Sequence, residues 1–292
     1  MTHRNLVNFK YRSGEAALRN LSEGSVYFAK AAQLNDSLEA KFSPASPSSY
    51  ALTLAQTLTE LAQQRGEAAK YVPEESTADY FAKAIQEEDA KFAANCLSVG
   101  IFSGTKRPDN QPMWAYYCND SRGVCFELEW PKDVLVEYSL FSTFVHYTDR
   151  PRIHDRFEDM REELLALGSK HPDWSVAQLH EHMGSKEFRT GWVASSMARA
   201  VSTKHLDWAH ETELRMLSPK AGALPILKRI LKRVYFTRFD FPEVAPILRL
   251  LKEEYPTVRT ARISFNHAEP LVSIENGEFR LVPLTMPPLP VL

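Results

Sequence analysis

The sequence predicts a mixed α+β protein whose core is a mostly antiparallel sheet, with helices inserted between the strands. Three observations support this class. The chain starts with a strand, a helix and a strand, continues through two long helical stretches, and ends in a series of strands. A doubly wound sheet would need a regular alternation of strands and helices instead. We expect one α+β domain over residues 1–292, with helical insertions at about 48–94 and 151–201.

The N-terminal segment predicts a strand, a helix and a second strand. Leu6–Tyr11 alternates loosely between apolar and polar residues, as a strand does. Ser13 can cap the following helix and Gly24 can end it, because serine favours N-caps and glycine favours the position just past a helix. Val26–Ala29 then suits a second strand.

The middle of the chain predicts helices on either side of a strand. Leu52–Arg65 and Ser76–Ala94 are rich in good helix formers, and Met113–Cys118 suits a short helix. The apolar run Cys96–Phe102 favours a strand.

Gly123–Trp130 is the clearest strand of the chain. Val124, Phe126, Leu128 and Trp130 alternate with Cys125, Glu127 and Glu129, which gives two distinct faces. We expect Val134–Tyr138 and Thr143–Tyr147 to be its neighbouring strands.

The C-terminal half predicts helices followed by strands. Arg152–Leu167 and Val176–Val201 are helical in pattern, with Gly184 and Gly191 weakening the second. Glu211–Leu217 alternates like a strand. The remaining expected elements are the strands Ile230–Phe236 and Arg259–Phe265, the helix Val244–Glu254, and a hairpin of Leu271–Glu275 and Glu278–Val282 around Asn276-Gly277.

Composition narrows the functional classes. The formal net charge of −2 lacks the basic footprint of a typical nucleic-acid-binding domain, although a local basic patch is compatible with it. The three cysteines, Cys96, Cys118 and Cys125, show no CxxC spacing, so we expect free thiols in a reducing cytosol. Met1–Lys10 lacks the apolar stretch of a signal peptide, and no run approaches the roughly 20 apolar residues of a membrane span. We therefore expect a cytoplasmic protein with no membrane partner.

The polar face of Glu211, Glu213 and Arg215 is the first candidate site. Two carboxylates side by side on a strand repel each other, and such repulsion can raise one pKa and suit acid–base or cation-stabilising roles. The alternative is a solvated face on which Arg215 balances the carboxylates. The nearby Trp208 and His210 favour a lined cleft.

The segment Tyr11-Arg12-Ser13 ends the first strand. An arginine there can grip a phosphate or carboxylate with two hydrogen bonds, and Ser13 with the helix N-terminus can add donors. The alternative is an ordinary surface arginine followed by a capping serine.

Two further clusters attract interest. Asn35, Asp36 and Glu39 form either a turn with its cap or a binding cluster, and with Lys41 they carry the residue types of a metal nuclease. Trp114, Tyr116 and Tyr117 combine core packing with a ring that could stack on a flat ligand. The histidine spacings do not fit the HExxH zinc pattern, and we expect no metal site.

Four segments resemble a bacterial family catalogued as a domain of unknown function (number twenty-nine seventy-one). They run from Phe9 to about Leu217, and their order and spacing carry the resemblance. The segments are Phe9-Lys10-Tyr11-Arg12-Ser13; Val26-Tyr27-Phe28-Ala29 with Leu34-Asn35-Asp36-Ser37-Leu38-Glu39; Met113-Trp114-Ala115-Tyr116-Tyr117 with Gly123-Val124-Cys125-Phe126-Glu127; and Lys204 with Trp208 and His210-Glu211-Thr212-Glu213-Leu214-Arg215.

The layout also resembles the ADP-ribosyltransferase fold, especially its toxin-like branch. Arg12, the helix to Gly24, Tyr27 and Glu213 fall in the order of that frame. The resemblance implies NAD as substrate, with Arg12 on the pyrophosphate and an aromatic ring on the nicotinamide. Its candidate catalytic residues are Glu213, Glu211 and Arg215, and its candidate NAD-binding residues are Tyr11, Arg12, Ser13, Tyr27, Asn35, Asp36, Trp114, Tyr116 and Tyr117.

These resemblances imply a bacterial toxin or anti-phage defence effector that modifies a nucleic acid or protein. The alternatives are a non-catalytic recognition or assembly module of a defence system, or a metal-dependent nuclease. The apolar, proline-rich tail Met286–Leu292 indicates either a segment docked on the body of the protein or a contact in a homo-oligomer.

Overall fold

The computed structural model of the chain describes residues 5–35, 47–67, 71, 90–92, 94–149, 156–263, 265, 272–275 and 278–281. The chain divides into two compact units. The sheet unit comprises Met1–Ala29, Gly100–Val145 and Asp207–Leu292, and the helical unit comprises Lys30–Val99 and His146–Leu206. The expectation of a single domain stays a prediction.

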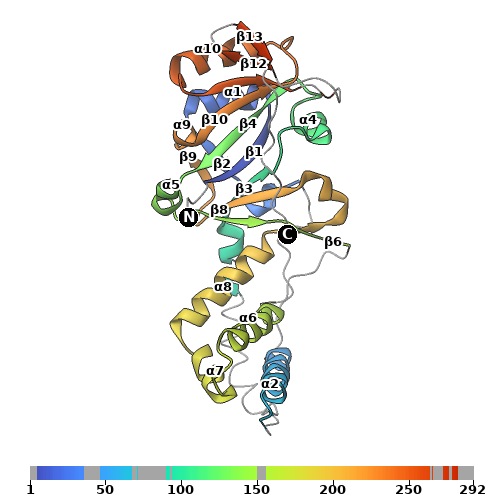
Figure 1. Cartoon of the computed structure of the whole chain (residues 1–292), viewed down its shortest axis with the longest axis vertical. Helices are drawn as coiled ribbons and strands as arrows, with labels where there is room; N and C mark the ends of the chain where they lie inside the picture. Colours follow the sequence, from blue (N-terminus) through green and yellow to red (C-terminus); the bar gives the residue numbers. More distant parts are fainter. Residues whose placement is uncertain are drawn as a thin grey trace. The chain divides into compact units, whose positions relative to one another are not determined.

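A nine-stranded sheet forms the centre of the sheet unit (Figure 1), in the order β13-β12-β11-β10-β4-β1-β3-β8-β5. Only the β10–β11 pair is parallel among these pairings, so the mixed, mostly antiparallel α+β class is confirmed. The strands are β1 (Leu6–Ser13), β3 (Gly100–Thr105), β4 (Gly123–Trp130), β5 (Phe141–Phe144), β8 (Glu213–Ser218), β10 (Leu231–Phe236), β11 (Arg259–Arg262), β12 (Val272–Glu275) and β13 (Glu278–Leu281).

Both faces of the central strands are covered. Helices α1 (Gly14–Glu23) and α10 (Val244–Glu254) pack together on one face, over the side chains of β4 that include Phe126 and Trp130. Helix α4 (Gln111–Tyr117) lies on the other, where Trp114 contacts the cluster of Tyr11 and Cys125. The two-sided alternation expected for β4 is confirmed.

The first helix begins and ends where its sequence signals predict. The Ser13 hydroxyl oxygen accepts a hydrogen bond from the Ala16 amide (3.3 Å), and Gly24 adopts the left-handed conformation that glycine favours at this position. The chain then enters β2 (Val26–Phe28), which pairs with β9 (Gly222–Leu224). Immediately after β2, Ala29 exchanges two backbone hydrogen bonds with Ile101 of β3.

One expected strand is wrong, and both expected neighbours of β4 are wrong. Val134–Glu137 lies in helix α5 (Lys132–Glu137), with Tyr138 as its C-cap; Val134 is buried and Val136 is 70% exposed. The neighbours of β4 are β1 and β10, whereas β5 pairs with β8 and Thr143–Tyr147 is divided between β5 and β6. Val134, Val136 and Tyr138 alternate as in a strand, whereas Val134, Leu135 and Tyr138, which pack on the core, have helical spacing; this ambiguity explains the error.

The strand expected at Cys96–Phe102 also begins later than predicted. Residues 94–98 are helical, and β3 starts at Gly100. Cys96 is buried while Leu97 is 51% exposed, so this apolar run presents one face to a core, as an amphipathic helix does.

The helical unit contains the helices of both expected insertions. Helices α2, α6, α7 and α8 pack around Leu61, Leu164 and Leu179. Ser185 caps α8 after Gly184 ends α7, so the helix expected over Val176–Val201 is two helices. Most of the helix expected over Ser76–Ala94 lies outside the described residues. The elements of this unit are η1 (Ala31–Gln33), α2 (Pro47–Gln64), β6 (His146–Thr148), α6 (Arg156–Lys170), α7 (Val176–Met183), α8 (Lys186–Ala200) and β7 (Thr203–His205).

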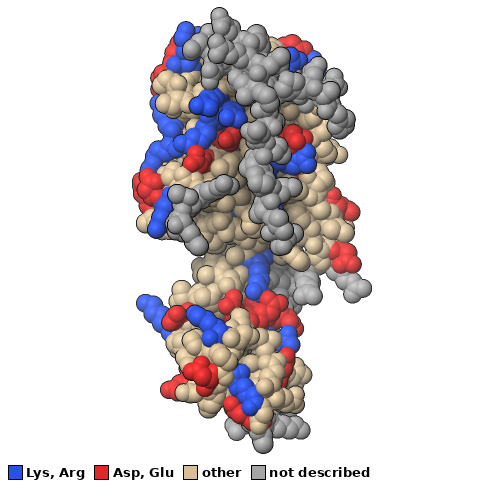
Figure 2. All heavy atoms as spheres, viewed as in Figure 1, with Lys and Arg blue, Asp and Glu red and all other residues tan. Residues whose placement is uncertain are grey.

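Two short helices complete the described elements: η2 (Leu206–Glu211) and α9 (Leu227–Ile230). No helix within the described part of the chain is long and apolar enough to span a membrane. The face shown in Figure 2 carries acidic and basic side chains interspersed, in line with the formal net charge of −2.

Candidate functional site

Lys10 lies where β1 and β3 separate. The two strands pair through one residue pair, Phe9 with Thr105, whereas β1 pairs with β4 along its whole length. Just past this pair, the Nζ of Lys10 donates a hydrogen bond to the backbone oxygen of Ser103 on β3. The lysine side chain therefore occupies the position that the next β1–β3 backbone contacts would fill.

Arg12 lies two residues along β1 from Lys10, on the same side of the strand. Its Nε is buried and has no hydrogen-bond partner within the described residues. Burial lowers the pKa of Arg12 to about 10, and the Cys118 thiol acts weakly in the opposite direction. Arg12 therefore stays cationic at neutral pH. Neither Lys10 nor Arg12 forms an ion pair with another described residue.

The pKa of Lys10 depends on charged residues of both β1 and the Glu211–Arg215 segment. Burial, followed by the charge of Arg12, lowers this pKa to about 7, and Arg215 adds a smaller effect in the same direction. The carboxylates of Glu213 and Glu211 oppose the shift. The pKa of the Lys10 amine therefore depends both on Arg12 of the first strand and on Glu211 and Glu213, about 200 residues later in the sequence.

Glu213 and Arg215 form a buried ion pair on β8. The Nε of Arg215 donates to Oε2 of Glu213 at 2.8 Å, and their side chains are 1% and 5% exposed, respectively. Alternation along the strand places both on one face, as expected. Arg215 thus fixes the orientation of the Glu213 carboxylate.

Glu211 lies outside β8, which corrects the expected strand Glu211–Leu217. It is the last residue of η2, and Thr212 turns the chain with a positive φ of 46°. A β-branched residue rarely adopts this conformation, and such strain is typical of functional sites. The hydroxyl of Thr212 lies 3.1 Å from that of Thr105, a contact that holds the turn against β3. Both Glu211 and Glu213 are buried on either side of it.

The three candidate aromatic residues of α4 have three different environments. Trp114 is fully buried and its Nε1 donates to the Pro108 oxygen (2.8 Å). The hydroxyl of Tyr117 donates to Oε1 of Glu211. Tyr116 is 72% exposed, with its ring centroid 6.2 Å from that of His210. Only Tyr116 of these three presents a largely open ring.

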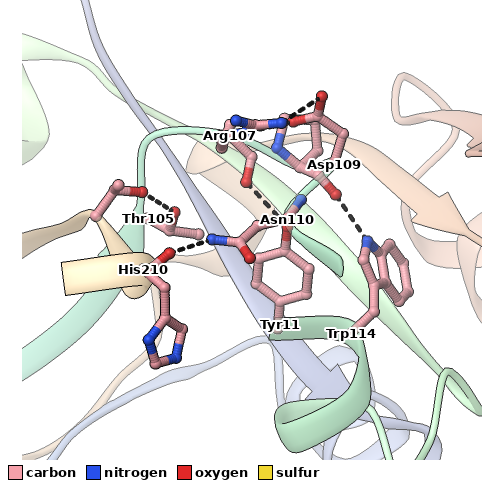
Figure 3. A network of polar contacts seen from close by, with 9 residues as sticks. Tyr11, Thr105, Arg107, Asp109, Asn110, Trp114 and His210 are labelled. Atoms are coloured by element: carbon pink, nitrogen blue, oxygen red, sulfur yellow. Dashed lines mark hydrogen bonds and ion pairs between the residues drawn. The ribbon is translucent and has the colours of Figure 1, made fainter. Parts of the chain in front are cut away.

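A network around residues 106–110 joins β1, α4 and η2 (Figure 3). The Tyr11 hydroxyl donates to the Arg107 oxygen (2.9 Å) and accepts from the Asn110 amide (3.1 Å). The Asn110 side chain donates to the His210 oxygen at 2.5 Å. Tyr11 is 3% exposed, and its partners give it a role in holding this loop. The loop in turn fixes the residue that precedes Glu211.

The remaining candidate residues fall elsewhere. Ser13 caps α1, and the Glu243 carboxylate lies against Gly14, so an acidic group already faces the start of this helix. Tyr27 is 44% exposed in the small β2–β9 sheet. Asn35 belongs to the helical unit, and Asp36 lies outside the described residues.

All three cysteines are buried free thiols. Burial raises the pKa of Cys96 and Cys118 to about 12 and raises that of Cys125 as well, which makes all three unreactive thiols. Across the described ranges, no group of three or more His, Cys, Asp or Glu residues is placed to hold a metal ion. The nuclease residues Asp36, Glu39 and Lys41 lie outside those ranges.

Sequence reasoning missed Lys10, Thr105, Thr212 and Asn110. Lys10 is a single lysine in an alternating strand, and its position at the strand separation depends on a β3 segment some 90 residues away. The positive φ of Thr212 has no sequence signal, because threonine is not a residue that favours it.

Residues 113–216 match the model of the family described as "Protein of unknown function (DUF2971)". The match runs from α4 into β8, so it includes Tyr116, Tyr117 and the Glu211–Arg215 segment. This confirms the resemblance to a domain-of-unknown-function family over these residues. No curated protein and no solved structure matches the chain. The resemblance to the ADP-ribosyltransferase fold stays a prediction.

Proposed function

We propose that this protein is an NAD-dependent ADP-ribosyltransferase-like enzyme that acts on a nucleic acid or protein acceptor. The observation that carries the proposal is the shared action of Arg12 and Glu213 on Lys10. Lys10 is therefore the residue whose charge both groups influence, at the place where the sheet separates between β1 and β3.

Glu213 has the surroundings that the chemistry needs. Cleavage of the bond between nicotinamide and ribose builds positive charge on the sugar. A preorganised carboxylate stabilises such charge most effectively in a buried site, where water does not screen it. Arg215 holds Glu213 in one orientation. Glu211 is held by Tyr117 and supports the same site.

The binding roles follow from exposure and charge. Arg12 keeps its positive charge and a buried Nε without a partner among the described residues, so it can receive an anionic group. Tyr116 carries the exposed ring of α4, and its centroid lies 6.2 Å from that of His210. His210 directly precedes Glu211 in the sequence. We assign Tyr116 rather than Trp114 to stacking on a flat ring of the substrate.

Release of nicotinamide from NAD by the purified full chain tests the proposal. We expect release with NAD alone or with a panel of single-stranded DNA, RNA and protein acceptors, and transfer of labelled ADP-ribose to one of them. The binding of NAD without release, or the absence of both, would contradict the enzymatic proposal.

The second candidate is a non-catalytic recognition module in a bacterial defence system. The exposed ring of Tyr116 beside His210, which itself stacks 6.3 Å from Trp208, favours this candidate because such rings suit a binding surface. Retention of a partner by a chain that does not turn over NAD would support it. In either case we place the protein in the cytoplasm.

A further inference from the structure

Strand β1 carries two positive charges that have no counter-charge among the described residues. Lys10 and Arg12 lie on one side of β1, two residues apart, and the charge of Arg12 lowers the pKa of Lys10 by repulsion. Neither has an ion-pair partner within the described part of the chain. Both residues are partly buried, with the Arg12 Nε fully so, and a cation drawn out of water without a counter-charge is costly, so proteins normally pair such groups or neutralise them.

The groups that face Lys10 do not supply the missing negative charge. Glu213 is engaged by Arg215, and Glu211 accepts from Tyr117. Four charged groups act on Lys10: the cations Arg12 and Arg215 and the carboxylates Glu211 and Glu213. Their charges cancel, so the positive charge of Lys10 is not balanced by them. The other neighbour of Arg12 is the Cys118 thiol, which its raised pKa of about 12 keeps neutral.

The donor geometry also leaves room for a ligand. The Nζ of Lys10 has three donors, uses one on the Ser103 oxygen and lies 5.1 Å from the centroid of the Phe102 ring, which leaves donors for a ligand. The Nε of Arg12 is buried with its hydrogen unused. A strand advances about 6.6 Å over two residues, so the two cations are spaced to receive neighbouring anionic groups rather than a single atom.

We propose that Lys10 and Arg12 form one anion site at the separation of β1 and β3, and that its ligand is the diphosphate of a dinucleotide. The anion site rests on the two unpaired cations, whereas the choice of a dinucleotide rests on the proposed function. Lys10 is a binding residue in addition to the arginine expected from the sequence. It acts as a point charge beside the forked guanidinium of Arg12.

Proton linkage gives the site a recognisable signature. Because the pKa of free Lys10 is about 7, most of this amine is neutral at pH 8. A bound diphosphate favours the charged amine, so binding at pH 8 takes up a proton. An arginine at this position would bind without proton uptake, since it is already charged.

Isothermal titration calorimetry of the full chain with sodium pyrophosphate tests the proposal, at pH 8 in two buffers of different ionisation enthalpy. We expect binding, weaker binding of inorganic phosphate, and no binding of acetate. Lys10→Met and Arg12→Gln should each weaken binding by about tenfold or more. Net proton uptake should be greater for the wild type than for Lys10→Arg, because the protons that pyrophosphate itself exchanges on binding are common to both proteins. Lys232→Met is the matched control, because Lys232 is exposed and lies 3.6 Å from Glu129 on another part of the sheet.

The outcomes separate this inference from the proposed function. Undetectable pyrophosphate binding by the wild type, or equal binding by Lys10→Met or Arg12→Gln, would overturn the anion site. Preferential binding of inorganic phosphate would overturn the assignment of a diphosphate. Thermal melts establish that each variant is folded, and Arg12→Gln tests the site independently of the Lys10 variants. Pyrophosphate binding without nicotinamide release leaves the anion site intact and contradicts only the transferase.

Discussion

Arg215 holds Glu213 in a buried ion pair whose N–O distance is 2.8 Å, and both residues belong to the same face of β8. Two charges removed from water are costly to bury, and their pairing offsets that cost only while both are present. The stability of the fold and the proposed role of Glu213 therefore both depend on this pair.

Removal of Arg215 should destabilise the protein strongly. Arg215→Met removes the guanidinium that pairs with the buried Glu213 carboxylate, and loss of one member of a buried pair costs about 3–5 kcal/mol. Arg229→Met is the control, since Arg229 pairs with Asp133 and Glu137 at the surface and its loss should change little. Urea denaturation measures both. A similar midpoint for Arg215→Met and wild type would show that the pair is not a buried unit.

The loop network should depend on a single hydroxyl. Tyr11→Phe removes the group that accepts from the Asn110 amide and donates to the Arg107 oxygen. Leaving these groups unsatisfied should lower the free energy of unfolding by about 1–3 kcal/mol. Tyr116→Phe makes the same chemical change at an exposed ring and should leave stability unaltered. Equal melting temperatures for the two variants would contradict the role of the Tyr11 hydroxyl.

Two glycines should respond in opposite directions to alanine. A Cβ at Gly104 would lie 2.5 Å from the Asn8 side-chain nitrogen, and Asn8 is itself held by the Trp130 Nε1 at 2.9 Å. Gly104→Ala should therefore destabilise by about 1–3 kcal/mol through overpacking. Gly191 lies inside α8 with nothing within 4 Å of its Cβ position, so Gly191→Ala should stabilise by about 0.5–1 kcal/mol. Chemical denaturation decides, and a stabilising Gly104→Ala would disprove the tight contact.

Stability should rise with pH through the titration of Lys10. Its folded pKa of about 7 lies below the ordinary value of 10.5, so between these values the unfolded chain binds more protons than the folded one. The free energy of unfolding then increases with pH by no more than about 1.4 kcal/mol per unit for this group. Below pH 7 both states are protonated and the contribution is flat.

The comparison with Lys10→Met isolates this effect. The difference in unfolding free energy between wild type and variant should grow in favour of the wild type from about pH 7 to 9. Parallel pH profiles for the two proteins would mean that the Lys10 amine is not buried as described.

The local elements were largely predictable because their signals are local. Strand β4 alternates strictly, Ser13 and Gly24 bound α1, and the limits expected for α10 coincide with those found. The errors fell on short apolar runs such as Val134–Tyr138, where strand and helix patterns are hard to distinguish.

The candidate site was only partly predictable, because it depends on strand order. Arg12, Glu213 and Arg215 could be singled out from residue type and position. The role of Lys10 required the separation of β1 from β3, a relation between distant segments that no short window contains. The burial of Trp114 and Tyr11, as against the exposure of Tyr116, likewise follows from the packing of α4 on the sheet.

The most direct test of the proposed function is the rate of nicotinamide release from NAD by Glu213→Gln. The amide keeps an oxygen that can accept from Arg215 but loses the charge that would stabilise the ribosyl cation. We expect a loss in kcat/KM equivalent to about 2.7–4 kcal/mol, with a smaller loss in Glu211→Gln and with circular dichroism showing both variants folded. Full activity in folded Glu213→Gln would contradict the assignment of this carboxylate.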